Sequence, residues 1–401
     1  MRVIKANAIP KFIEILIVLY VFHTTIPIFG YYTPAIVHSG IMLLLYVYLA
    51  VYDKSFGRNV MMVLPIFSIH ILHLLLRSSS FTKELYMELQ LFLYPLLALY
   101  LMRYADRKAL KRILLFIGIS YLVTAITTYI GNQIFPYASR NLAAVFQSDE
   151  EYMYDVYMKF NIGGFNIIYA YVLLTPVVMY MIRSKVVPRI ISILLLIVIS
   201  LVIVISEYTT AFFSLIMIVA SLLVMPKNFG TRHLVGLVSI MFFVLFVFDS
   251  FIFPNMASLT GIFGSDLVNA RLLELVNLSS GSGAFEGDLG SRYDFYKMSF
   301  DSFLKSPIWG SRNATLGGHS YFFDTLGGYG LLGLIAIILM YRQLLKVFYK
   351  PFPNNEFYGY SIFVLGIAIM LVILNPKDNI TLLTFTVPVI AAFFSKKTQR
   401  I

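Results

Sequence analysis

The chain contains recurrent apolar windows of the length that crosses a lipid bilayer, and this pattern restricts its fold more than any motif does. About 20 consecutive apolar residues span a bilayer as one helix. Such windows fall at residues 12–30, 33–51, 60–76, 85–102, 113–130, 164–182, 189–206, 208–225, 234–253, 321–341, 358–374 and 379–395. With 59% hydrophobic and 13% charged residues, the composition excludes a soluble protein. The sequence predicts an all-α polytopic membrane protein, one integral membrane domain over residues 1–401, with about 12 transmembrane helices.

The lysines and arginines indicate which side of the membrane each loop faces. Cytoplasmic loops collect positive charge. With a cytoplasmic N-terminus, most of the 31 lysines and arginines fall on the cytoplasmic side, among them the cluster between Arg103 and Arg112. We therefore expect both termini in the cytoplasm and two extracytoplasmic loops, 131–163 and 254–320. Topology and anionic lipid explain the net charge of +11, so a nucleic-acid partner is not expected.

Cysteine usage and the first apolar run exclude other possibilities. The chain has no cysteine, which excludes disulfides, thiol catalysis and thiolate metal sites. The first apolar run contains Glu14, and no small-x-small cleavage site precedes Gly30. We interpret this run as the first transmembrane span and not as a cleaved signal peptide.

The loop 254–320 is the longest polar stretch of the chain. Its part NLSSGSGAFEGDLGS, residues 277–291, holds four glycines and is typical of a mobile connector. The next segment, SRYDFYKMSFDSFLKS, has helical periodicity with an S-x-x-D capping signal at Ser291, and Pro307 ends it. One face carries Tyr293, Tyr296, Phe300 and Phe303, and the opposite face carries Asp294, Lys297, Asp301 and Lys305. The pattern predicts an interfacial helix with its aromatic face toward the membrane.

Arg292 stands at the expected start of this helix, where the helix dipole disfavours a cation. The position is favourable if an anion binds there, because free backbone N–H groups and the guanidinium would converge on one phosphate. The alternative is a solvated or headgroup-bound arginine. Arg312 and Arg140, in the two outer loops, are further candidates for the same anion or interfacial anchors.

The six histidines differ in their expected surroundings. His319 alone stands at an outer boundary, between flexible glycines and an apolar span, where an imidazole could act in catalysis or be structural. His70 and His73 share a helix face, but two ligands make no metal site, and hydrogen bonds across helices are expected. We expect His23 and His38 at the membrane interface and His233 in a cytoplasmic loop.

The remaining polar residues suggest no established motif. The outer-loop run of acids and tyrosines (Asp149, Glu150, Glu151, Tyr152, Tyr154, Asp155, Tyr157) could contact a sugar or form a solvated amphipathic loop. Glu88, Glu207 and Asp249 lie in or near spans, where the energetic cost of a charge makes a functional role a reasonable hypothesis. Neither a phosphate-binding Gly-rich loop nor an H-E-x-x-H or G-x-S-x-G motif is present.

The order of the outer-loop motifs resembles a known family. An arginine begins a helix in GSRYDFYKMSFDSFLKSPIWG, and His319 opens the span that contains GYGLLG. This order resembles the O-antigen polymerase and ligase superfamily, and most of all the Wzy-type polymerases of bacterial capsule or exopolysaccharide. SPIWG matches a small-Pro-apolar-x-Gly element, and Ser320 follows the histidine where asparagine is common. The segment SEYTTA, with Glu207, departs from the arginine that many ligases carry between the seventh and eighth spans.

This resemblance implies glycosyl transfer between polyprenyl-pyrophosphate-linked oligosaccharides at the outer face of a bacterial plasma membrane. His319 would be the base, and Arg292, helped by Arg140 or Arg312, would bind the pyrophosphate of the donor. Further implied substrate contacts are Tyr296, Tyr321 and Glu207. Inverting displacement would need no metal and no cofactor, and other polysaccharide-assembly membrane proteins would be further partners.

Two other functions remain open. A ligase would use the same residues and transfer the finished glycan to another lipid, a wall polymer or a protein. A flippase or transporter would need a polar cavity through the helix bundle. The few charges within the spans disfavour this second alternative.

Overall fold

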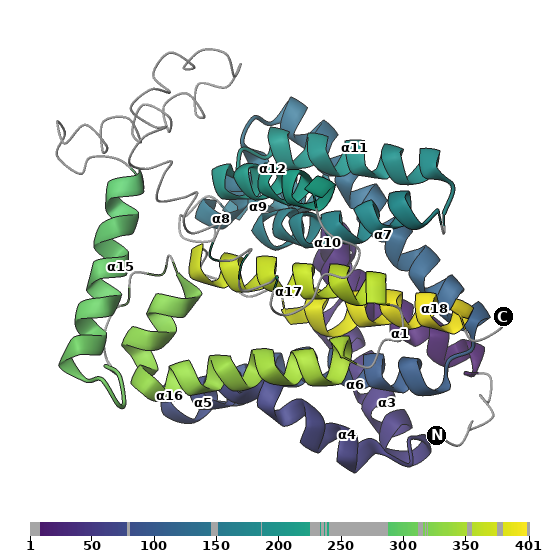
Figure 1. Cartoon of the computed structure of the whole chain (residues 1–401), viewed down its shortest axis with the longest axis horizontal. Coiled ribbons are helices and arrows are strands. Elements are labelled where there is room, and N and C mark those ends of the chain that lie inside the picture. The colour runs from purple at the N-terminus through teal and green to yellow at the C-terminus, as the bar shows by residue number, and fades with distance from the viewer. Residues whose placement is uncertain are drawn as a thin grey trace. The chain divides into compact units, whose positions relative to one another are not determined.

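The computed structural model describes residues 9–77, 81–145, 151–185, 187–224, 233, 236, 239, 288–311, 316, 318, 320–350, 355–374 and 380–398. Helices and turns make up these residues, and no strand occurs among them (Figure 1). The prediction of an all-helical protein is confirmed for this part of the chain.

The helices have the following bounds. The N-terminal half contains α1 (Lys11–Thr25), α2 (Pro27–Tyr32), α3 (Ala35–Tyr52), α4 (Phe56–Val63), the 3₁₀ turn η1 (Leu64–Phe67), α5 (Ser68–Arg77), α6 (Phe81–Tyr104), α7 (Arg107–Ile134), α8 (Ala138–Val145) and α9 (Glu151–Lys159). The remainder contains α10 (Phe165–Ser184), α11 (Arg189–Ile205), α12 (Thr209–Val224), α15 (Asp288–Lys305), α16 (Tyr321–Leu344), the π-helix η4 (Leu345–Tyr349), α17 (Asn355–Leu374), the π-helix η5 (Leu382–Thr386) and α18 (Val387–Thr398).

Seven of the described helical stretches are long and apolar enough to cross a membrane. They are Ala35–Tyr52, Phe56–Leu76, Phe81–Tyr104, Arg107–Ile134, Phe165–Ser184, Tyr321–Tyr349 and Glu356–Leu374. Three shorter apolar helices are Arg189–Ile205, Thr210–Leu223 and Leu382–Ser395. These stretches identify the protein as a helical membrane protein.

Other predicted windows give less than a full span. In the window 12–30, α1 ends at Thr25, because Ile26 is extended ahead of Pro27, and residues before proline disfavour helical geometry. The window 234–253 lies outside the described residues, apart from residues 236 and 239. The expectation of about 12 spans is therefore not reached within the described part.

The chain divides into two compact units. The first comprises residues 1–228, 339–364 and 379–401, and the second comprises residues 229–338 and 365–378. In the first unit, α10 packs against α11 and α12, while α7 contacts α1, α11 and α18. Its largest fully buried side chains include Tyr20, Tyr94 and Tyr171. The second unit contains α15 and the first part of α16.

The predicted outer loop 131–163 is folded. After α7, the chain forms the short helices α8 and α9, which share a small apolar core of Ala138, Leu142, Tyr157 and Ile162. Tyr157, which was expected to face a sugar or solvent, is only 4% exposed. Asp149 and Glu150 lie outside the described residues.

Candidate functional site

In the second unit, α15 begins earlier than its capping signal predicts. The helix starts at Asp288, so Arg292 lies in its second turn and the expected cap at Ser291 is wrong. A cation in the second turn is farther from the unpaired N–H groups that make a helix start favourable for anions. The backbone of Arg292 is helical, and its side chain lies outside the described residues.

Two serines of α15 form hydrogen bonds with α16. The Ser299 hydroxyl donates to Asp324 Oδ1 at 2.6 Å, and the Ser302 hydroxyl donates to the Gly327 carbonyl at 3.3 Å. Of the predicted aromatic row, Tyr296 stacks on Phe323 with ring centroids 5.5 Å apart, whereas Phe300 stays 42% exposed. The expectation that this aromatic face lies toward the membrane stays a prediction, and one member of the row, Tyr296, packs on α16.

The packing at Gly327 explains why Ser299 and Ser302 face α16. A Cβ at Gly327 would collide with the carbonyl oxygen of Ser299, so the two helix backbones approach closely here. Small side chains permit such an approach, as they do in other helix pairs in membranes. Aromatic side chains on the same face would separate the helices.

The helices α15 and α16 run parallel. Both hydrogen bonds join residues 25 positions apart in the chain, and the stacked pair Tyr296 and Phe323 has nearly the same offset. Figure 1 shows α15 beside the first part of α16. The N-terminal ends of both helices therefore lie at the same end of the pair.

Asp324 stabilises the start of α16. The Ser320 hydroxyl accepts from the Phe323 backbone N–H at 3.1 Å, and the Ser320 N–H donates to Asp324 Oδ2 at 3.3 Å. This reciprocal arrangement is a variant of the capping box. Asp324 was not among the predicted site residues, although its spacing from Ser320 resembles a capping signal. Tyr321, half-buried, is the first residue of α16.

The SPIWG turn packs directly on the glycine-rich part of α16. Gly330 has a φ of 60°, which interrupts the helical geometry, and the Leu331 N–H donates to the Pro307 carbonyl at 2.8 Å. A Cβ at Gly330 would collide with that same carbonyl oxygen. The Ser311 N–H donates to the Gly327 carbonyl at 2.8 Å. The two motifs that suggested the family are thus in contact with each other.

The segment between Ser311 and Ser320 is attached to α16 at both ends. Ser311 bonds to Gly327, and Ser320 caps the helix. Gly318, with a φ of 70°, is described, whereas Arg312 and His319 lie outside the described residues. Of the predicted site residues in this unit, the structure thus brings Tyr296 and Tyr321 to the start of α16, beside Asp324.

In the first unit, the residues next to Arg140 and Glu207 in the chain are hydrogen-bonded to each other. The Tyr208 hydroxyl donates to the Ser139 carbonyl at 2.8 Å, and Arg140 and Glu207 directly adjoin this pair in the chain. The Arg140 charge acts on the Tyr208 hydroxyl, so the guanidinium lies near it.

Asn132 holds Ser139 in this position. Its side-chain amide donates to the Ser139 hydroxyl at 2.6 Å, and its carbonyl oxygen accepts from the Ser139 N–H at 3.1 Å. Asn132 and Ser139 are both buried. The start of α8, and with it Arg140, is therefore fixed to the end of α7.

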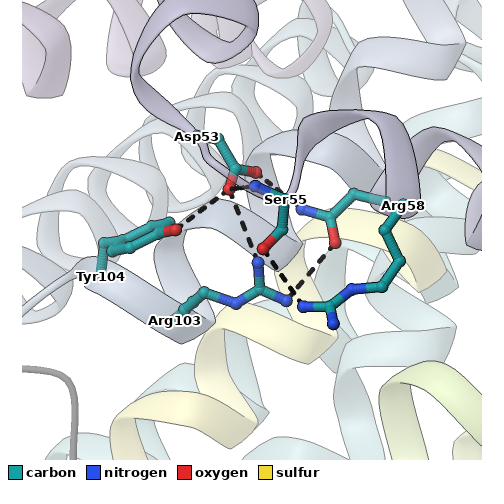
Figure 2. A network of polar contacts seen from close by, with 6 residues as sticks. Asp53, Ser55, Arg58, Arg103 and Tyr104 are labelled. Carbon is teal, nitrogen blue, oxygen red and sulfur yellow. Dashed lines mark hydrogen bonds and ion pairs between the residues drawn. The ribbon is translucent and has the colours of Figure 1, made fainter.

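A second buried polar network surrounds Asp53, which the sequence analysis did not single out (Figure 2). Its carboxylate accepts from the Ser55 N–H, the Asn59 amide and the Tyr104 hydroxyl at 2.7 to 3.1 Å, and Arg103 lies 3.5 Å away. Asp53 is 3% exposed. Because these partners occupy the carboxylate oxygens of Asp53, the network has a structural role and attaches the α3–α4 turn to α6.

The histidines of the first unit take part in helix packing. His70 Nδ1 lies 3.2 Å from Glu88 Oε1, which confirms the expected bond across helices. His38 is 3% exposed and stacks on His23 with ring centroids 3.8 Å apart, so it is buried among the helices. Within the described ranges, no three His, Cys, Asp or Glu side chains are grouped as a metal site would require.

Comparisons with known proteins supply no family for this chain. No protein-family model matches it, and no curated protein matches its sequence. The composition and the apolar helices define its class, a helical membrane protein.

Proposed function

We propose that the protein is a polysaccharide polymerase of the Wzy type. It transfers a growing glycan from polyprenyl pyrophosphate to a lipid-linked oligosaccharide repeat unit at the outer face of the bacterial plasma membrane. The proposal includes about 12 spans and cytoplasmic termini. The loop 254–320 then lies outside the cell membrane, where the two lipid-linked substrates meet.

The parallel register of α15 and α16 is the observation that carries this proposal. Contacts at constant offset join 296 with 323, 299 with 324 and 302 with 327. On α15, Arg292 precedes Tyr296 by about one helical turn, and Tyr296 packs on Phe323 at the start of α16. We propose that Arg292 and His319, the two residues that the resemblance selects, act together at this end of the helix pair.

These two side chains have complementary chemical roles. The His319 imidazole takes the proton from the acceptor hydroxyl while the hydroxyl oxygen bonds to the anomeric carbon of the donor sugar. The bond from that carbon to the pyrophosphate oxygen breaks, and the Arg292 guanidinium offsets the charge that develops on the pyrophosphate. Attack opposite the leaving group inverts the anomeric centre. A pyrophosphate paired with arginine leaves readily, so no divalent metal is required.

Asp324 supports the proposed base through the backbone. The Ser320 nitrogen that donates to Asp324 is covalently bonded to the carbonyl carbon of His319. The Ser299 hydroxyl donates a hydrogen bond to the other carboxylate oxygen of Asp324. Asp324 is therefore a positioning residue, which restrains the chain next to the base.

The test uses purified protein with lipid-linked repeat units as the only substrate. A polymerase has donor and acceptor in that one compound, so we expect a ladder of longer lipid-linked glycans and release of polyprenyl pyrophosphate in the presence of EDTA. His319→Ala should remove the ladder, because loss of a general base lowers rates by about 10²–10⁴-fold. His233→Ala is the matched control and should keep it.

Other outcomes reject the proposal in distinct ways. No ladder until a different acceptor is added would identify a ligase. Unchanged product mass with lipid moved between leaflets would identify a flippase. A ladder that EDTA abolishes would refute metal independence, and a normal ladder from His319→Ala would make that histidine structural.

A further inference from the structure

The membrane-spanning stretch that contains α16 is longer than a bilayer is thick. Tyr321–Tyr349 has 29 residues, which make about 43 Å of helix, whereas the hydrocarbon core of a bilayer is about 30 Å thick. One end of the stretch therefore extends beyond the hydrocarbon. Either the bilayer ends near Arg342 and includes the first part of α16, or it begins near Gly330 and excludes that part.

The exposed face of α15 favours the second placement. This helix runs beside the first part of α16 (Figure 1), to which it is hydrogen-bonded. Its exposed side chains there include four charged ones, Asp294, Lys297, Asp301 and Lys305. Charged side chains are costly within hydrocarbon. The pair formed by α15 and the first part of α16 is therefore placed outside the hydrocarbon.

Exposed side chains become apolar at the point where α15 ends. Leu304, Ile308 and Trp309 are exposed by 55 to 57%. On α16, the exposed side chains that follow Gly330 are also apolar, namely Leu331, Ile335 and Ile338. Tryptophan is enriched at membrane–water interfaces, where its ring is in an apolar layer and its N–H group reaches water. The apolar end of α15 is thus continuous with the lipid-facing side chains of α16.

Close backbone contacts fix the turn after α15 at the kink of α16. A Cβ at Gly310 would collide with the backbone of Gly328, and the Leu331 N–H donates to the Pro307 carbonyl at 2.8 Å. Trp309 lies between Pro307 and Gly310 in the chain. Its position relative to α16 is therefore restrained on both sides.

We propose that the membrane surface lies at Gly330, and that Leu304, Ile308 and Trp309 insert into its interfacial layer of lipid. The transmembrane part then runs from Leu331 to Tyr349, about 28 Å of helix. The three lipid-contacting residues differ from the aromatic row that helical periodicity assigned to the membrane. The inference concerns depth in the bilayer and does not rest on the proposed glycosyl transfer.

This placement has consequences for both ends of α16. Arg342 lies about 10 Å along the helix from Tyr349, where a long side chain can extend toward the headgroups. Tyr321 lies about 13 Å along the helix from Gly330, on the aqueous side. The start of α16, with the cap formed by Ser320 and Asp324, is then accessible from water and from the lipid headgroups.

The test uses Trp309, the only tryptophan of the chain, so its fluorescence reports this one position. The full-length protein is placed in phosphatidylcholine nanodiscs that contain brominated lipid. Bromine near the ester end of the acyl chains should quench most of the Trp309 fluorescence, and bromine near the methyl end should quench little of it. In a Trp309→Phe background, Ile338→Trp is the deep reference and Lys297→Trp the reference that aqueous acrylamide quenches.

Two fluorescence outcomes would overturn the proposal. Quenching of Trp309 by acrylamide alone, as at Lys297→Trp, would place the turn in water. Strongest quenching by bromine near the methyl end, as at Ile338→Trp, would place the turn deep in the bilayer.

Single cysteines provide a second measurement in the same nanodiscs. Asp301 and Ile335 are both exposed on the protein, so a difference in their reactivity reports the lipid. Asp301→Cys should react with a membrane-impermeant maleimide, and Ile335→Cys should be protected. Equal reactivity at the two positions would show that no membrane surface lies between them and would reject the proposal.

Discussion

Ser299 on α15 donates a 2.6 Å hydrogen bond to the carboxylate of Asp324 on α16, while the other oxygen of that carboxylate accepts from the Ser320 N–H. The Asp324 side chain therefore takes part both in the contact between the two helices and in the N-terminal cap of α16. Because both helices run in the same direction, the bond also sets which residues of α15 lie level with the start of α16.

Removal of the Ser299 hydroxyl should destabilise the protein. Ser299→Ala leaves a carboxylate oxygen of Asp324 without its short bond, and a bond to a charged group contributes about 1.5–3 kcal/mol. Ser302→Ala, a matched change on the same face, loses a 3.3 Å bond to a neutral carbonyl and should cost less, about 1 kcal/mol. Thermal unfolding in detergent compares the two. Equal midpoints would show that the Asp324 bond has no special role.

Gly330 should not tolerate a side chain. Alanine there would adopt an unfavourable left-handed φ, and its Cβ would collide with the Pro307 carbonyl oxygen. We expect Gly330→Ala to destabilise by about 2 kcal/mol or more. Gly118→Ala on α7 is the control, because nothing lies within 4 Å of a Cβ there, and helix propensity favours alanine. A thermal midpoint for Gly330→Ala as high as that of Gly118→Ala would contradict the kinked packing.

Lysine at position 292 should not restore full polymerase activity. An ammonium carries the charge but lacks the planar fork that binds two phosphate oxygens together. We expect the ladder from Arg292→Lys to form at least about 10-fold more slowly, with Arg292→Ala slower still. Initial rates with purified lipid-linked repeat units measure this. Wild-type rates for Arg292→Lys would leave Arg292 as a surface charge.

Labelling in intact cells tests the orientation in the membrane. Single cysteines at Gly57, Lys108 and the C-terminus should be protected from an impermeant maleimide, because the basic segments near them belong in the cytoplasm. Single cysteines at Glu150 and Ala284 should react. The chain has no cysteine of its own, so each signal comes from one site. Reaction at Lys108 from outside would invert the topology and place His319 in the cytoplasm.

Hydropathy and local chain chemistry were sufficient to predict much of the fold. A bilayer leaves no partner for backbone N–H and C=O groups except within the helix, so long apolar windows become helices whatever their neighbours. The helix before Pro307 was predicted for a local reason too, since proline cannot continue its hydrogen bonds. The same rule divides the first apolar window at Pro27.

Tertiary contacts decided the remaining features, because they join residues far apart in the chain. Helical periodicity identified an aromatic face on α15, but the close approach at Gly327 selected Ser299 and Ser302 as the packed face. Nothing local indicates that Gly330 kinks α16 against Pro307. Arg140 and Glu207 were separate candidates until the bond from Tyr208 to Ser139 brought their loops together. Sequence periodicity specifies which residues share a face, whereas only the packed structure selects the face that is buried and its partner.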